Sequence, residues 1–235
     1  MSWLTVSGGR YPASSVIEVL TPMMSEARIS RFNEVLKHRI TSISLGLEDL
    51  HHEHNGAACL RTAECFGIHR VMAAETRNAY PIPRTISMSA HQWLDIEKYS
   101  SGVDMIRSVQ QQGMKVFGAG PRGTYKLEDI PINDPVLILF GNEADGLLDE
   151  TMDACDEVFR IPMYGFTESL NLSVSVGIVL QQLTHRKRHQ LLQSGIEGEL
   201  DQSERDALFL KWIVRDFKNI EVILKGLLGV PQPID

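Results

Sequence analysis

No apolar run in this 235-residue chain approaches the about 20 residues that are needed to span a bilayer. The N-terminus, MSWLTVSGGR, also lacks a basic stretch leading into an apolar segment. From these two absences we expect neither a membrane-spanning protein nor a secretory signal. We therefore expect a soluble, cytoplasmic protein.

Cysteine is scarce. The three cysteines Cys59, Cys65 and Cys155 form no CxxC pair, and an odd number cannot all be joined in disulfides. The run at residues 51–54, HHEH, gathers possible metal ligands, but its adjacent positions lack the spacing of a zinc site. We expect reduced thiols and no bound metal.

An excess of positive charge is also missing. Lys and Arg number 23 against 30 Asp and Glu, a net charge of -7. This excludes a protein that coats nucleic acid nonspecifically, because phosphate binding draws on clustered cations. Two segments nevertheless concentrate basic side chains, namely Arg28, Arg31, Lys37, His38 and Arg39 in the first and His185 to His189 in the second. Each is either a solvated helix face or a local contact for phosphate.

Hydrophobic periodicity predicts alternating strands and helices from about residue 41. Strands are expected at 43–50, 69–75, 114–119, 135–140 and 157–162, and helices at 55–66, 103–112 and 170–185. This alternation predicts an α/β fold with a mainly parallel sheet and helices on both faces. The helix at 170–185 is apolar nearly all round, so we expect it in the core or at a dimer seam.

Amphipathic helices are expected outside this region. One covers 23–40, and a final one carries Leu210, Ile213, Phe217 and Leu224 after a polar, turn-prone segment at 195–206. The predicted organisation is a helical arm at 1–41, a main domain at 42–190 and a C-terminal helical extension at 191–235.

The first of three motifs spans Asn55 to Thr62. Asn55 is the expected N-cap of the helix, and the stripe Cys59, Ala63 and Phe66 faces the core. Arg61 then points away from this stripe. Helical side chains lean toward the N-terminus, so its guanidinium can reach a ligand near the helix start. For an isolated arginine on a helix, a surface residue or an ion-pair partner would be the better interpretation.

The second motif, LFGNEADGL at 139–147, runs from an apolar strand into a loop. Loops at the carboxyl ends of strands are where open α/β sheets bind ligands. Gly141 would allow close approach of the backbone to a ligand, and Glu143 could hold Arg61 or another polar partner. Taken alone, this segment is also typical of an ordinary turn.

The third motif, IPMYGFTESLNLSVS at 161–175, joins a strand to the apolar helix. Its polar residues Ser169, Asn171, Ser173 and Ser175 exceed what a helix cap requires. We expect a ligand or a partner subunit to receive the surplus hydrogen bonds.

In this order and at these separations, the three motifs resemble the signature of the TrmH/SpoU branch of the SPOUT methyltransferases. The resemblance covers roughly residues 24 to 225 and is strongest to the tRNA guanosine 2′-O-methyltransferase subgroup. It implies S-adenosylmethionine as cofactor, tRNA as the RNA partner with a D-loop guanosine as target, and a homodimer whose active site lies near the subunit interface. It also implies a deep C-terminal trefoil knot at about 139–183, against the usual rule that chains are unknotted.

The resemblance also assigns residues by motif position. Arg61 is the catalytic candidate at the ribose hydroxyl, and its supporting residues are Asn55, Glu143, Ser169 and Asn171. Backbone groups that hold the bent cofactor are those of Ala119, Gly141, Ile161 and Leu170. The two basic segments, rather than the motifs, supply the expected RNA contacts, which are Arg28, Arg31, Arg186 and Arg188, with the arm of one subunit serving its partner's site. Ala119 departs from relatives that carry a hydroxyl there.

Three other functions stay open. The same motifs suit methylation of ribosomal RNA, and the acidic balance would also suit a noncatalytic RNA-binding homologue. A generic nucleotide-binding module is disfavoured, because the chain has neither GxGxxG after its first predicted strand nor GxxxxGK[ST].

Overall fold

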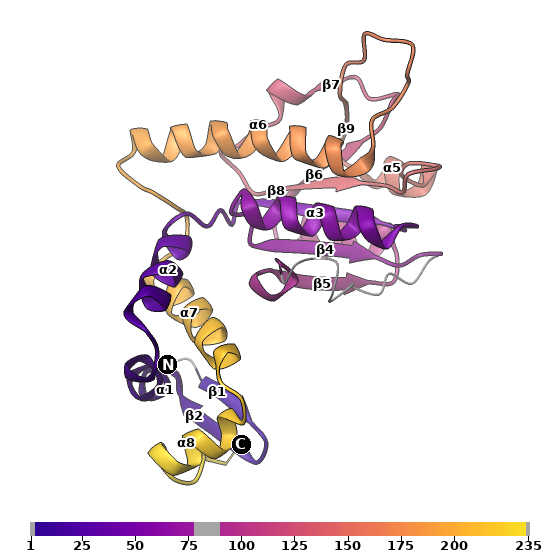
Figure 1. Ribbon diagram of the computed structural model, residues 1–235. Coiled ribbons are helices and arrows are strands. Elements are labelled where there is room, and N and C mark those ends of the chain that lie inside the picture. The colour runs from indigo at the N-terminus through magenta and orange to yellow at the C-terminus, as the bar shows by residue number, and fades with distance from the viewer. Residues whose placement is uncertain (1–2, 78–89, 234–235) are drawn as a thin grey trace. The chain divides into compact units, whose positions relative to one another are not determined.

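The computed structural model describes residues 3–77 and 90–233. The chain forms two compact units, one of Met1–His38 with Leu200–Asp235 and the other of Arg39–Glu199 (Figure 1). The two ends of the chain thus fold into one unit, whereas the sequence suggests a separate arm and extension. The two connections run side by side where they leave the larger unit, because Glu199 N donates to Arg39 O at 3.0 Å.

A seven-stranded sheet, in the order β5-β4-β3-β8-β6-β9-β7, forms the centre of the larger unit, and every pairing in it is parallel. Its strands are β3 (Ile43–Glu48), β4 (Arg70–Ala74), β5 (Asp95–Tyr99), β6 (Lys115–Ala119), β7 (Tyr125–Lys126), β8 (Val136–Phe140) and β9 (Glu157–Arg160). The central strands β3 and β8 are buried along their whole length, as expected of a sheet covered on both faces. The predicted α/β class and all five predicted strands are confirmed.

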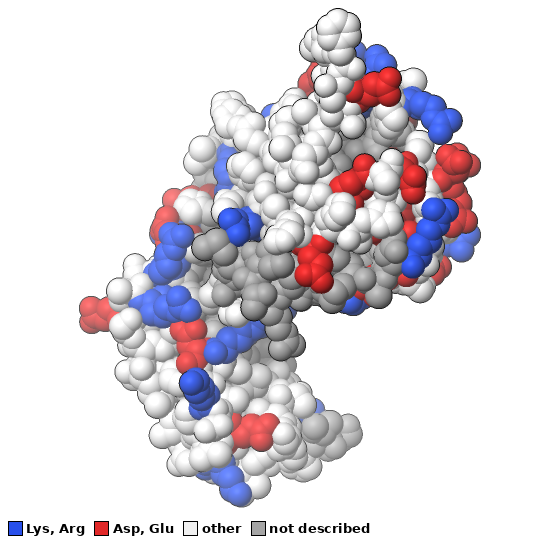
Figure 2. All heavy atoms as spheres, turned by 45° about the vertical axis from the view of Figure 1, so that its right-hand side comes forward, with Lys and Arg blue, Asp and Glu red and all other residues white. Residues whose placement is uncertain are grey.

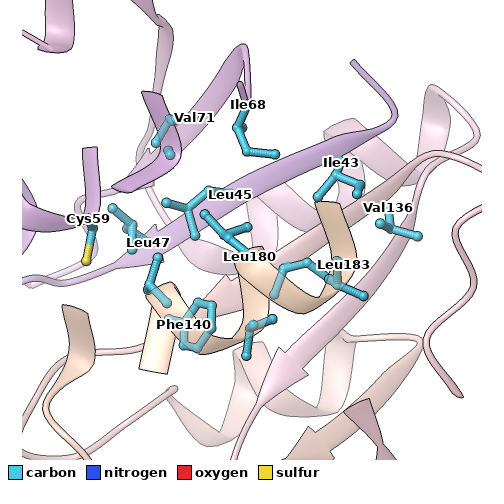
Figure 3. Close-up of a cluster of buried hydrophobic side chains, with 14 of the residues drawn as sticks. Ile43, Leu45, Leu47, Cys59, Ile68, Val71, Val136, Phe140, Leu180 and Leu183 are labelled. Atoms are coloured by element: carbon cyan, nitrogen blue, oxygen red, sulfur yellow. The ribbon is translucent and has the colours of Figure 1, made fainter. Parts of the chain in front are cut away.

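Helices cover both faces of the sheet, as the alternation predicts. On one face α3 (Glu53–Cys65) and α6 (Leu172–Gln193) pack together over a cluster that includes Leu47, Cys59, Phe140 and Leu180 (Figure 3). On the other face lie α4 (Gly102–Gln111) and the short α5 (Asp149–Ala154). Short 3-10 helices of the larger unit are η2 (Ala90–Trp93) and η3 (Leu127–Asp129).

Helix α6 is buried on one side only. Val176, Val179 and Leu180 are fully buried, whereas Val174 and Ile178 are 47% and 40% exposed. The predicted place in the core is therefore confirmed for one face only, and the alternative place at a dimer seam stays a prediction. The physical reason is that only one face of a helix can rest on a sheet, so the apolar opposite face stays uncovered here.

The smaller unit contains the hairpin β1 (Trp3–Val6) and β2 (Gly9–Pro12), with α1 (Ala13–Leu20), η1 (Thr21–Met23), α2 (Glu26–Lys37), α7 (Gln202–Asp216) and α8 (Ile220–Leu228). Its core packs Phe32 edge-on against Trp212 at 5.6 Å between ring centroids. The single final helix predicted from the sequence is wrong. Helix α7 ends at Asp216 because Phe217 is extended, with φ −105° and ψ 124°, and Asn219, with a left-handed φ of 56°, is the N-cap of α8.

Glu199, at the boundary of the larger unit, contacts both α6 and the residues just before β3. Its carboxylate pairs with Lys187 at 2.8 Å and accepts hydrogen bonds from the backbone of Thr41 (2.9 Å) and Ser42 (2.8 Å). Burial alone would raise the pKa of Glu199, but the bonds from Lys187 and Ser42 outweigh it and hold the pKa below the ordinary value of 4.5. The carboxylate form is therefore favoured in the folded state.

We predict that Glu199→Ala lowers the free energy of unfolding by about 3 kcal/mol, because Lys187 is left buried without its carboxylate partner. Because the pKa of Glu199 is lower in the folded state, its contribution to the free energy of unfolding is complete above the ordinary carboxyl pKa. This contribution is lost as the pH falls through the folded pKa. Urea titrations of both proteins at neutral pH and in increasingly acidic buffers test this. A difference in stability that stays constant down the whole series would contradict it.

Candidate active site

The candidate site lies at the edge of the sheet where parallel strands end. At this edge β3, β8, β6 and β9 finish at Glu48, Phe140, Ala119 and Arg160, and the chain enters α3 and α6 (Figure 1). Strand ends of this kind leave backbone groups unpaired and position the following loops next to one another. All three sequence motifs are found here.

Asn55, Glu143 and Asn171, one from each motif, form a hydrogen-bonded row. Asn55 Nδ2 donates to Glu143 Oε1 at 2.6 Å, and Asn171 Nδ2 donates to Asn55 Oδ1 at 3.1 Å. The backbone N–H of His51 donates to the second oxygen of Glu143 at 3.3 Å. Residues separated by 88 and 116 positions in the chain thus meet at one place. The expectation that Glu143 holds a polar partner is met by Asn55.

The predicted capping role of Asn55 is wrong. Helix α3 begins at Glu53 with His52 as its N-cap, so Asn55 lies inside the first turn. A cap is defined by backbone angles, and several consecutive polar residues could have adopted them. By contrast, Asn171 does cap α6, accepting from the backbone N–H and the hydroxyl of Ser173 at 2.9 Å and 2.6 Å.

Glu143 is held as a carboxylate. Burial alone would raise its pKa, but the hydrogen bonds from Asn55 and the backbone and the charge of His52 outweigh it, so that the pKa is lowered from the ordinary 4.5. The row therefore presents a fixed negative charge beside the start of α3.

We predict that Asn55→Ala raises the pKa of Glu143, because the side-chain hydrogen bond that stabilises the carboxylate is lost while its partial burial remains. NMR titration of the side-chain carboxyl carbon measures the shift. Asn171→Ala is the matched control, because Asn171 bonds to Asn55 and not to the carboxylate, and its effect should be smaller. An unchanged pKa in Asn55→Ala would refute the assignment.

The loop that carries Glu143 closes on itself. Asn142 and Gly146 exchange two backbone hydrogen bonds of 3.1 Å, and Asn142 Oδ1 accepts from the N–H groups of Ala144 and Asp145. A Cβ atom at Gly141 would lie 2.0 Å from the backbone of Gly146. The sequence predicts a close approach of Gly141 to a ligand, and the structure shows that its close neighbour is the loop itself.

Arg61 lies on the exposed face of α3, while Cys59 and Ala63 of the same helix are fully buried. This confirms the predicted stripe and the outward direction of the arginine. Ser169 and Leu170 lie in an exposed segment, residues 162–171, so the structure places them outside the buried part of the site.

The expected cofactor contacts line the same strand edge. Ala119 ends β6, Gly141 follows β8 and Ile161 follows β9, and Ala119 and Ile161 pack partly buried against the core. Leu170 is 38% exposed at the approach to α6. Because β8, β6 and β9 are neighbours in the sheet, the main-chain groups of Gly141, Ala119 and Ile161 lie at adjacent strand ends.

Two polar residues near the site were missed from the sequence. Asn142 shapes the loop through its side chain, and Glu48 is a fully buried carboxylate at the end of β3. The signal for Glu48 was an acid that closes an otherwise apolar strand, but burial could not be inferred from it, because acids at strand ends are commonly solvated.

The basic residues of the first segment differ in their surroundings. Arg28 donates twice to Asp216 at 2.8 Å and lies over the ring of Phe32, whereas Arg31 is exposed. Arg39 is completely buried, and its guanidinium donates to main-chain carbonyls. Its inclusion in an exposed basic patch is therefore wrong.

The second basic segment holds α6 to its own unit. Arg186, Lys187 and Arg188 donate to the main-chain oxygens of Ile130, Ile132 and Phe66 at 2.9, 2.8 and 2.8 Å. On the face drawn in Figure 2, acidic and basic side chains of the described residues are interspersed rather than gathered by sign. Part of the second basic segment therefore serves hydrogen bonds within the fold.

In the part of the chain that the structure describes, no three His, Cys, Asp or Glu side chains are arranged to hold a metal ion. No described helix is both long and apolar enough to cross a membrane.

Comparison with known proteins agrees with the fold and the motifs. The SpoU rRNA methylase family matches residues 42–181, more than half of the chain and all three motifs, and the chain belongs to this family. A tRNA (guanosine(18)-2′-O)-methyltransferase of Borreliella burgdorferi is 32% identical over 88% of this chain and 94% of its own length. The crystal structure of the Aquifex aeolicus TrmH/SpoU tRNA modifying enzyme superposes with a TM-score of 0.73 at 26% identity, covering 83% of this chain and 98% of that one. A 23S rRNA (guanosine-2′-O-)-methyltransferase of Vibrio parahaemolyticus is 28% identical over 66% of this chain and 64% of that protein.

Proposed function

We propose that this protein transfers a methyl group from S-adenosylmethionine to the ribose 2′-oxygen of a guanosine in tRNA. The relatives that match nearly their whole length are named for this reaction at guanosine 18. The observation that carries the proposal is the row of Asn55, Glu143 and Asn171, which unites all three motifs at one strand edge.

The donor set at this edge fits such a cofactor. S-adenosylmethionine supplies the reactive methyl group on its sulfonium when it is bound. Main-chain groups of Ala119, Gly141, Ile161 and Leu170 would hold it, and their small or apolar side chains offer no competing hydrogen bonds. Ala119 in particular contributes no side-chain hydroxyl.

Arg61 would act on the ribose. An arginine stays protonated in proteins and is therefore a poor proton acceptor, so we assign Arg61 the task of orienting the 2′-hydroxyl together with a phosphate of the RNA. Ser169 lies beside Asn171, the cap of α6, and would complete the polar wall of the site. Holding the ribose oxygen in line with the methyl group can supply much of the rate.

We extend the proposal to a homodimer with the site near the subunit interface and to a trefoil knot at about 139–183. Support for the dimer comes from uncovered apolar side chains. Val174 and Ile178 of α6 are 47% and 40% exposed, and Tyr164 and Phe166 of the preceding segment are 96% and 107% exposed. Support for the knot is family membership. A partner covering these side chains would also enclose Leu170 and Ser169.

RNA contacts are proposed for Arg28, Arg31, Arg186 and Arg188, from the arm of one subunit to the site of its partner. Arg31 is the best placed of these, because it is exposed on α2. Arg28, Arg186 and Arg188 already donate hydrogen bonds to other groups of the chain. They would have to bind an RNA phosphate in addition to these partners.

The test is methylation of purified tRNA and of purified ribosomal RNA with labelled donor, followed by mapping of alkali-resistant linkages. We expect one modified guanosine in tRNA. Modification of ribosomal RNA alone would favour the second candidate function, methylation of ribosomal RNA, which the similarity to the Vibrio parahaemolyticus protein supports. Absence of both methylation and donor binding would indicate a noncatalytic RNA-binding protein.

A further inference from the structure

Glu48 is a buried carboxylate that belongs to none of the three motifs. It is the last residue of β3 and is 0% exposed. Its Oε1 accepts from the hydroxyl of Thr151 at 2.6 Å, and its Oε2 accepts from the backbone N–H of Leu148 at 3.1 Å. Both oxygens therefore have partners about a hundred positions away in the chain.

These bonds close the loop at residues 141–148. The loop leaves β8 at Phe140, which pairs with Leu47 of β3, the residue before Glu48. It returns to β3 at Leu148, the N-cap of α5, where the carboxylate holds it. One end of the loop is thus tied by the sheet and the other by Glu48.

The carboxylate is closely confined. A Cβ atom at Gly102, the first residue of α4, would lie 2.1 Å from Glu48 Oε1 and 2.6 Å from the hydroxyl of Thr151. Burial raises the pKa of Glu48 even though both hydrogen bonds oppose this, so enclosing the group costs free energy. An apolar residue would avoid this cost but would leave the Leu148 N–H unpaired.

We propose that Glu48 is a positioning residue for methyl-donor binding. Through Leu148 and Thr151 it sets the path of the 141–148 loop, and the loop in turn places the backbone of Gly141 and the carboxylate of Glu143. The proposal rests on the proposed function, because it takes the loop as part of the donor site. It predicts that removing the hydrogen bonds of Glu48 with Leu148 or Thr151 weakens donor binding more than RNA binding.

Thr151→Val is the decisive variant, since it keeps the side-chain shape and removes only the hydroxyl that bonds to Glu48. Calorimetry with S-adenosylmethionine should show a Kd raised by about tenfold for Thr151→Val and for Glu48→Gln. Thr151→Ser retains the hydroxyl and should stay within about twofold of wild type. The RNA affinity should stay unchanged in all three variants.

Glu97→Gln is the matched control. Glu97 is a partly buried carboxylate that pairs with Arg70 on β4 and does not contact the loop. It should lower the Tm without changing the Kd for the donor. Amide hydrogen exchange of residues 142–146, measured without ligand, should become faster in Thr151→Val and stay unchanged in Glu97→Gln.

A Thr151→Val protein with the donor Kd and exchange rates of wild type would overturn the role of Glu48, even if Glu48→Gln fails to fold. Equal losses of donor affinity in Thr151→Val and Glu97→Gln would also overturn it. If wild type itself binds no donor, the proposed function fails. Faster loop exchange in Thr151→Val would then show that only the structural part of the inference holds.

Discussion

Arg61→Ala is expected to lower the rate of methyl transfer by at least about a hundredfold, the usual cost of removing a positioned charged group at a reacting centre. Stability should change by less than about 0.5 kcal/mol, because Arg61 lies on the exposed face of α3 while the buried stripe of that helix is untouched. Single-turnover methylation of tRNA, together with donor binding and Tm, separates the chemical step from folding.

Arg61→Lys and Arg107→Ala complete this experiment. Lysine keeps the charge but not the planar fork of donors, so Arg61→Lys should recover only part of the rate. Arg107 is an exposed arginine on α4, which covers the opposite face of the sheet, and its removal should leave the rate unchanged. Unaltered methyl transfer in Arg61→Ala would refute the role given to this residue.

Gly141→Ala is expected to lower donor affinity by more than about tenfold and the free energy of unfolding by about 3 kcal/mol, an overpacking cost at the upper end of the usual range. The added Cβ would lie 2.0 Å from backbone atoms of Gly146, and backbone cannot rotate aside as a side chain can. The loop must therefore move as a whole, and it would move Glu143 with it.

Gly226→Ala provides the control for this substitution. Gly226 lies in α8, and a Cβ atom there would meet nothing within 4 Å. Alanine should stabilise that helix slightly, because it lowers the conformational entropy of the unfolded chain. Calorimetry and urea unfolding measure both proteins. A Gly141→Ala protein with wild-type stability and donor affinity would show that the loop is not closed as described.

The sequence predicted the centre of the fold better than its edges. Strands β3 and β8 are continuous apolar runs, and such runs are characteristic of strands buried on both faces. The edge strands β5 and β7 were missed because DIEKY is mostly polar and YK is only two residues long. At an edge, pairing with a single neighbour replaces burial as the stabilising contact, and it leaves little trace in hydrophobic periodicity.

Some features of the site could likewise be predicted from the sequence, and others could not. Asn55, Glu143 and Asn171 could be selected from their motifs, and the structure joins them by hydrogen bonds. The N-cap of α3 and the buried state of Arg39 could not be predicted, because each depends on backbone angles or on neighbours distant in the chain. The roles of Arg61, Ser169 and the cofactor contacts remain predictions that the experiments above test.

By itself, the sequence determined the α/β class, the three motifs and the side of α3 on which Arg61 lies, because periodicity and motif order are properties of local segments. The tertiary structure alone decided that Glu48 closes the 141–148 loop, that Arg186 and Arg188 hold α6 in place, and that both chain ends share one unit. The physical reason is that a polar group's partner is chosen by which donors and acceptors the packed chain leaves within reach. That choice is made only when strands far apart in sequence come side by side.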